Sequence, residues 1–68
     1  MTQDLQKAEQ TLLKAASSDS VVSSASLLAA AERAQPRIPA DTVRYAYWTL
    51  VSAGKLERTA RGVRKTAK

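Results

Sequence analysis

The chain has 68 residues, enough for one small domain, and eleven lysines and arginines against six acidic residues give it a net charge of +5. It contains no cysteine and no histidine. These absences exclude a disulfide framework, a zinc site built from such residues, and a serine or cysteine nucleophile with a histidine base. No apolar stretch approaches the roughly 20 residues of a membrane-spanning helix, and the polar start does not resemble a secretion signal. We therefore expect a soluble cytoplasmic protein.

The charge is unevenly distributed along the chain. Residues 1–34 carry three basic and four acidic side chains, whereas residues 35–68 carry eight basic and two acidic ones. The first half therefore has a net charge of −1 and the second half a net charge of +6. This asymmetry indicates a polyanionic partner such as a nucleic acid, although a basic tail that only aids solubility would give the same count.

The first half of the chain predicts two helices separated by a serine-rich break. Residues 3–16 place leucine and alanine at the three- and four-residue spacing of an amphipathic helix. The small polar residues at 17–20 favour a turn, and the two valines that follow are enough for a short strand or a single β-bridge. Residues 24–34 predict an alanine-rich second helix, with Ser23 and Ser24 as the two candidate N-caps.

Two prolines separate the second helix from a third one. Ile38, which stands between them, is an isolated apolar residue of the kind that fills a core between two helices. Residues 39–53 predict the third helix, with Pro39 at its first position and Gly54 where a left-handed C-terminal cap is needed. The apolar stripe of this helix consists of Val43, Ala46, Tyr47 and Leu50.

The last segment predicts a short β-hairpin. Residues 55–66 alternate as strands do around a turn at 60–62. Leu56 and Val63 are expected to pack on the third helix, because an isolated hairpin is only marginally stable in water. The cations expected at and near the tip of the hairpin are Arg58, Arg61, Arg64 and Lys65.

The order of these elements resembles that of winged helix-turn-helix domains. The resemblance is most specific within residues 20–59, where the chain matches the family pattern T-V-R-x-A-x-x-x-L-x-x-x-G-x-L. The matching residues are Thr42, Val43, Arg44, Ala46, Leu50, Gly54 and Leu56. The implied fold is mostly α (α+β): a single domain over residues 1–68, with three helices and a short C-terminal β-hairpin wing.

The resemblance also implies a function, that of a small DNA-binding transcriptional regulator of bacterial or bacteriophage type. The third helix would read the major groove of duplex DNA, and the basic wing would clamp the backbone. Arg44 would bind guanine or a phosphate, while Thr42 and Tyr45 would donate hydrogen bonds to phosphates. Arg61 would enter the minor groove. The residues expected to contact DNA are Thr42, Arg44, Tyr45, Trp48, Thr49, Arg58, Arg61, Arg64 and Lys65.

The alternative function is a protein-interaction module on the same fold, such as an inhibitor or a subunit of a nucleoprotein complex. Asp41 near the start of the third helix favours it, and the basic second half of the chain opposes it. Trp48 lies off the apolar stripe, so it either packs on the first helix or forms a surface for another protein or a homodimer.

Enzymatic activity, a cofactor, a metal, a small-molecule ligand and a membrane partner are not expected. The chain has no paired-carboxylate motif and no glycine-rich loop that could cradle a phosphate. Its basic residues fall on a predicted hairpin rather than along an amphipathic helix with a large apolar face.

Overall fold

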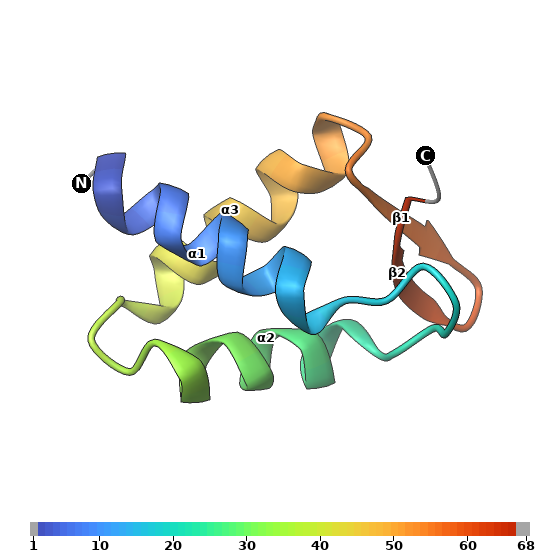
Figure 1. Cartoon of the computed structure of the whole chain (residues 1–68), viewed down its shortest axis with the longest axis horizontal. Helices are drawn as coiled ribbons and strands as arrows, with labels where there is room; N and C mark the ends of the chain where they lie inside the picture. Colours follow the sequence, from blue (N-terminus) through green and yellow to red (C-terminus); the bar gives the residue numbers. More distant parts are fainter. Residues whose placement is uncertain (1, 67–68) are drawn as a thin grey trace.

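The structure is a computed structural model that describes residues 2–66. It contains three helices followed by a two-stranded antiparallel hairpin (Figure 1). The helices are α1 (Thr2–Ala15), α2 (Ser24–Ala34) and α3 (Ala40–Ser52), and the strands are β1 (Leu56–Thr59) and β2 (Gly62–Lys65). This is the predicted mostly helical α+β layout with a hairpin wing. The boundaries of α1 and α3 differ from the predicted ones by one residue at each end.

The core lies between the three helices and the hairpin. In Figure 1, α1 crosses α3 and lies beside α2, and the hairpin stands at the end of the bundle where α1 ends and α2 begins. The predicted stripe of α3 is buried throughout, and Ile38 fills the core as expected. The buried side chains are Ala8, Leu12, Ala16, Leu27, Ala31, Ile38, Val43, Ala46, Tyr47, Leu50, Leu56 and Val63.

Local hydrogen bonds explain where α2 and α3 begin. The hydroxyl of Ser23 accepts the backbone N–H of Ser26 at 3.1 Å, so Ser23 caps α2 and the other candidate, Ser24, is the first residue of the helix. Pro39 precedes α3 instead of occupying its first helical position, and its carbonyl accepts the N–H of Val43 at 3.2 Å. Proline tolerates this place because its fixed φ of −59° fits the entry to a helix and it has no N–H to satisfy.

Gly54 ends α3 and directs the chain into the wing. Its φ of +78° is the left-handed conformation that side chains with a Cβ disfavour. The N–H of Lys55 donates a hydrogen bond to the carbonyl of Leu50 at 2.9 Å, and the N–H of Gly54 donates one to the carbonyl of Val51 at 3.1 Å. These two bonds satisfy carbonyls at the end of the helix. The direction in which β1 leaves α3 therefore follows from the predicted glycine cap.

The wing is attached to the helices through its second strand. Val22 forms a single β-bridge with Val63, with N···O distances of 2.7 and 3.0 Å, so β2 lies between β1 and the segment that precedes α2. Beside this bridge, a Cβ on Gly62 would lie 2.3 Å from the carbonyl oxygen of Val22. A glycine is needed at this position, because only a residue without a side chain allows the approach.

Candidate nucleic-acid interface

The side of α3 opposite the core forms an exposed face. Because the helix repeats every 3.6 residues, burial of its apolar stripe leaves Arg44, Tyr45, Trp48 and Ser52 toward solvent. Tyr45 and Trp48 are 62% and 49% exposed, although both are large aromatic side chains. Trp48 is thus a surface residue and not part of the core. Asp41 is also exposed, in the first turn of the same helix.

An open hollow runs along the second half of this face. It has a volume of about 510 Å³ and is lined by Tyr45, Trp48, Thr49, Ser52 and Ala53. The hollow is shallow and open to solvent, unlike the concave sites that enclose small ligands. Its shape therefore fits contact with a large partner.

Arg58 connects the wing to the exposed face of α3. Side chains alternate along a strand, so Arg58 lies on the same side of β1 as the buried Leu56 and is directed toward the helices. Its guanidinium carbon lies 5.0 Å from the centre of the Trp48 ring. This distance is that of a cation–π contact. The contact joins the wing and α3 into one surface that is both basic and aromatic.

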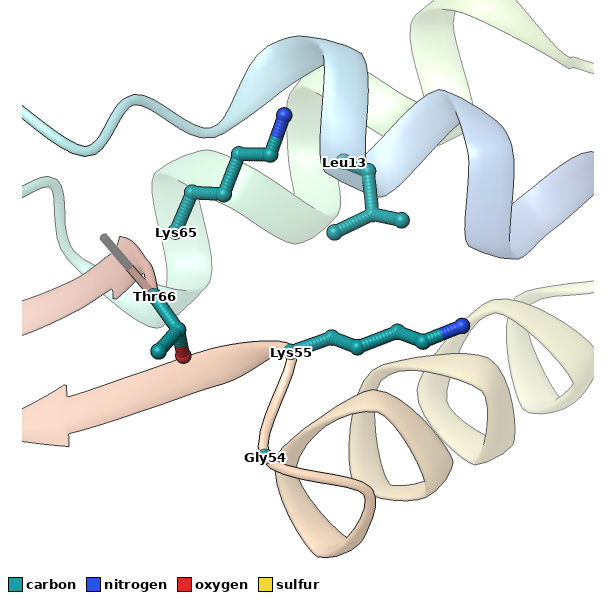
Figure 2. Close-up of a pocket in the computed structure, with 5 residues that line it drawn as sticks. All are labelled: Leu13, Gly54, Lys55, Lys65 and Thr66. Atoms are coloured by element: carbon teal, nitrogen blue, oxygen red, sulfur yellow. The ribbon is translucent and has the colours of Figure 1, made fainter. Parts of the chain in front are cut away.

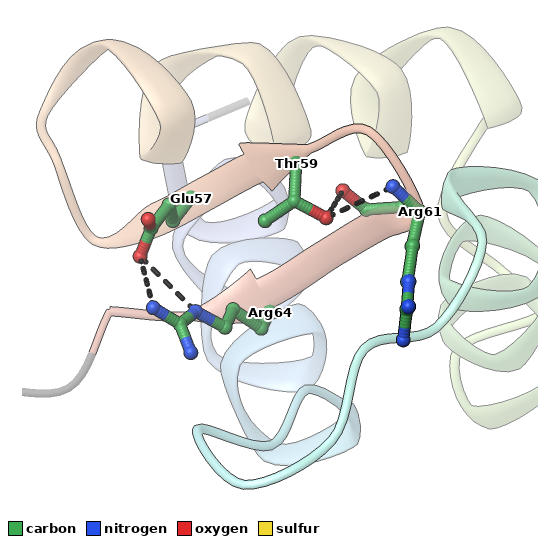
Figure 3. A network of polar contacts seen from close by, with 5 residues as sticks. Glu57, Thr59, Arg61 and Arg64 are labelled. Atoms are coloured by element: carbon green, nitrogen blue, oxygen red, sulfur yellow. Dashed lines mark hydrogen bonds and ion pairs between the residues drawn. The ribbon is translucent and has the colours of Figure 1, made fainter.

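Arg64 lies on the opposite side of the hairpin and is paired with an acid. Its Nε and Nη2 atoms are both 3.1 Å from Oε1 of Glu57, the residue directly across the ladder (Figure 3). Both side chains are more than a third exposed, so water and salt weaken the pair. The carboxylate nevertheless neutralises much of the local charge of this arginine.

The turn between the strands presents Arg61. The hydroxyl of Thr59 accepts the backbone N–H of Arg61 and donates to the carbonyl of Gly62, both at 3.2 Å (Figure 3). These bonds order the backbone of the tip. The side chain of Arg61 is exposed, and within residues 2–66 no acidic group pairs with its guanidinium.

The expectation that Lys65 lies near the tip is wrong. The strand register pairs Lys65 with Leu56, at the end of the hairpin away from the turn. There it lines a hollow of about 290 Å³ with Lys55, Leu13, Gly54 and Thr66 (Figure 2). Because the strands alternate and the ladder is antiparallel, the predicted group of four wing cations is divided over two faces and two ends of the hairpin.

The two threonines among the predicted contacts are half-buried. The hydroxyl of Thr49 lies 2.7 Å from Oε2 of Glu9 on α1 and 2.8 Å from the carbonyl of Ala46. This hydroxyl therefore connects α1 to α3 within the chain. Thr42 is the third residue of α3 and lies in its first turn, on the flank between the core stripe and the exposed face.

Three exposed arginines lie on α3 and the wing: Arg44 on α3, Arg58 on β1 and Arg61 in the turn, where the Arg61 side chain is directed away from α3 (Figure 3). None of them has an acidic partner within salt-bridge distance among the described residues. Sequence reasoning selected all three, but it missed the pairing of Arg64 with Glu57 and the contact of Arg58 with Trp48. The strand register could have indicated the first, because it places Glu57 opposite Arg64, whereas the second depends on how the hairpin is placed against α3.

Residues 2–66 contain no group of three or more acidic residues that could hold a metal ion. None of the described helices combines the length and the apolar character required to cross a membrane. Comparisons of the chain with family models, with curated proteins and with solved structures find no match. The resemblance to winged helix-turn-helix domains thus depends on the pattern of the residues and on the order of the elements.

Proposed function

We propose that this chain binds duplex DNA through the exposed face of α3 and the wing. The observation that carries the proposal is that Arg44, Arg58 and Arg61, which have no acidic partner among residues 2–66, follow one another along α3, β1 and the turn. Arginine binds both phosphates and guanine edges through paired N–H donors. The apolar stripe of α3 is fully buried, so the arginine-bearing side is the one that can enter a groove.

The dimensions of the recognition element fit this role. α3 has 13 residues and is therefore about 20 Å long, and an α-helix fits the width of the major groove. Tyr45 on its exposed side can donate a hydrogen bond to a phosphate oxygen. Thr49 and Arg64, which hydrogen-bond within the chain, are secondary in this proposal.

The finer proposal is a cytoplasmic transcription regulator of bacterial or bacteriophage type. A single α3 spans only a few base pairs, so useful specificity requires a dimer or repeated sites. Base recognition is assigned to Arg44, and affinity that does not depend on sequence is assigned to the arginines of the wing.

A specific observation also favours a second candidate, a surface that binds another protein. Tyr45 and Trp48 are exposed beside an open hollow, and exposed aromatic side chains are frequent anchors of protein interfaces. Asp41 at the start of α3 would repel phosphates that pass close to it. The excess of positive charge in the second half of the chain makes DNA the preferred partner.

A binding titration with charge-matched variants tests the proposal. Fluorescence anisotropy of a labelled 20-base-pair duplex is measured at about 50 and 200 mM salt. The test variant replaces Arg44, Arg58 and Arg61 by alanine, and the control replaces Lys7, Lys14 and Arg33, which lie on α1 and α2. Each variant loses three positive charges and has a net charge of +2 instead of +5.

The expected result is micromolar binding by the wild type that weakens steeply with salt. The test variant should lose most of the affinity, and its salt slope should fall by about 0.9 for each lost phosphate contact. The control should keep the wild-type slope. Equal losses in both variants would indicate attraction by net charge alone, and absence of binding at low salt would reject DNA as the partner.

A further inference from the structure

Trp48 is an exposed side chain whose ring is nevertheless held in place. Its ring meets that of Tyr47 edge to face, with centroids 5.1 Å apart and an interplanar angle of 78°. Tyr47 is only 3% exposed and belongs to the core. The indole is therefore supported from the core while about half of its surface lies toward solvent.

Arg58 rests on this indole. Directly across the ladder from Arg58 stands Val63, which is buried and bridged to Val22, so the backbone that carries the arginine is fixed. The guanidinium carbon lies 5.0 Å from the ring centroid of Trp48. A cation–π contact uses the ring in place of a carboxylate, so no acid among the described residues takes up the N–H donors of Arg58.

Arg64 provides a contrast within the same hairpin. Two of its nitrogen atoms are directed at Glu57, so part of its donor set and much of its charge are engaged. Arg58 has no such acidic partner among the described residues. Of the two arginines on the strands, Arg58 is therefore the one whose charge is available to bind an anion.

We infer that Trp48 is a positioning residue. Its ring holds the guanidinium of Arg58 in place before DNA binds, so that Arg58 forms a preorganised phosphate-binding group at the junction of α3 and the wing. This inference rests on the proposed function, because the anion is a phosphate of the DNA backbone. The entropy of ordering the arginine side chain is then lost on folding instead of on binding. Trp48 contributes to DNA affinity through Arg58, and not through a contact of its own.

A double-mutant cycle tests this role. The Kd for the 20-base-pair duplex is measured for Trp48→Leu, Arg58→Ala and the double variant, with Trp48→Phe as the conservative replacement. Tyr45→Leu, alone and combined with Arg58→Ala, is the matched control, since Tyr45 is an exposed aromatic on the same face. Thermal unfolding of each variant verifies that the fold is kept.

The expected result is non-additivity. Arg58→Ala should weaken binding about tenfold, Trp48→Leu nearly as much, and the double variant no more than Arg58→Ala alone. Trp48→Phe should keep most of the wild-type affinity for the duplex, because an aromatic ring remains beneath Arg58. In the control pair, the fold-losses of Tyr45→Leu and Arg58→Ala should multiply in the double variant. In the free protein, the Nε–H resonance of Arg58 should shift in Trp48→Leu and stay in place in Tyr45→Leu.

Two other outcomes would overturn the inference in distinguishable ways. If the losses of Trp48→Leu and Arg58→Ala multiply while the wild type binds DNA, Trp48 acts independently, and the proposed function stands without this refinement. If the wild type does not bind the duplex at low salt, the proposed function fails and the positioning role fails with it.

Discussion

At the scale of single residues, neighbouring acids determine which cations of the wing are available. Glu57 faces Arg64 across the ladder, at 3.1 Å from two of its nitrogen atoms, whereas Arg58 and Arg61 have no acidic partner in the described part of the chain. Cations of similar spacing in the sequence therefore differ in their electrostatic surroundings. The count of basic residues alone overstates the charge that the wing offers to a polyanion.

We predict that Glu57→Gln strengthens DNA binding. Removal of the carboxylate releases Arg64, and at about 50 mM salt the affinity should rise about two- to fivefold. Fluorescence anisotropy measures the change. The control is Glu32→Gln, which changes the net charge equally but lies exposed on α2. An equal gain in both variants would contradict a specific role for the pair.

Thr49→Val is expected to affect stability and not DNA binding. The variant removes the hydroxyl that lies 2.7 Å from Glu9, so chemical denaturation should show a loss of about 1 kcal/mol in the free energy of unfolding. The Kd for duplex DNA should stay within about twofold of the wild-type value, because the Thr49 hydroxyl bonds within the chain and is not part of the proposed DNA interface. Weaker binding at unchanged stability would instead place Thr49 in contact with DNA.

At the scale of elements, the attachment of the hairpin determines where the wing stands. β2 bonds to β1 on one side and to Val22 on the other, and Gly62 leaves the space that this bridge needs. Gly54, at the other end of β1, shares a positive φ with Gly62, +78° against +149°, but has open space where a Cβ would lie. The two glycines thus serve different purposes, close approach at Gly62 and chain reversal at Gly54.

Alanine substitutions should separate these purposes. Gly62→Ala should lower the free energy of unfolding by about 2–4 kcal/mol, because its Cβ would overlap the Val22 carbonyl. Gly54→Ala should cost about 1–2 kcal/mol, the strain of the left-handed conformation alone. Chemical denaturation of both variants provides the comparison. Equal losses would mean that the close approach of Gly62 to the Val22 carbonyl adds no cost to the backbone strain.

The helices and the hairpin could be predicted because their signals are local. The apolar spacing of α3 sufficed to identify four buried residues, and Ser23 and Gly54 marked helix ends that the structure confirms. Counting along the strands from the turn pairs Lys65 with Leu56, so its place away from the tip was also a local signal, and grouping it with the tip residues was the error. The bridge between Val22 and Val63 could not be predicted in this way, because it joins distant parts of the chain.

The candidate surface follows the same division. The exposure of Arg44 and Tyr45 follows from the helical period, which the sequence displays directly. The contact between Trp48 and Arg58 joins a helix to a strand across Gly54 and needs the angle between them, which no local pattern encodes. For the same reason, the half-buried position of Thr49 against Glu9 becomes apparent only once α1 lies on α3.

At the scale of the whole molecule, the core separates the basic surface from the first two helices. The described chain measures 30 × 21 × 16 Å. Figure 1 shows α3 and the wing following one another along the longest dimension. The second half of the chain carries a net charge of +6 and the first half −1. The proposed DNA contacts on α3 and the wing therefore belong to the half of the chain that carries the excess positive charge.

The most direct test of the central claim is a ¹⁵N NMR titration of the protein with a short duplex, which a chain of 7.3 kDa permits. The account predicts that amide shifts concentrate in residues 41–52 and 57–64, together with the indole N–H of Trp48, the only tryptophan in the sequence. Shifts confined to α1 and α2, or none at near-millimolar DNA, would contradict it.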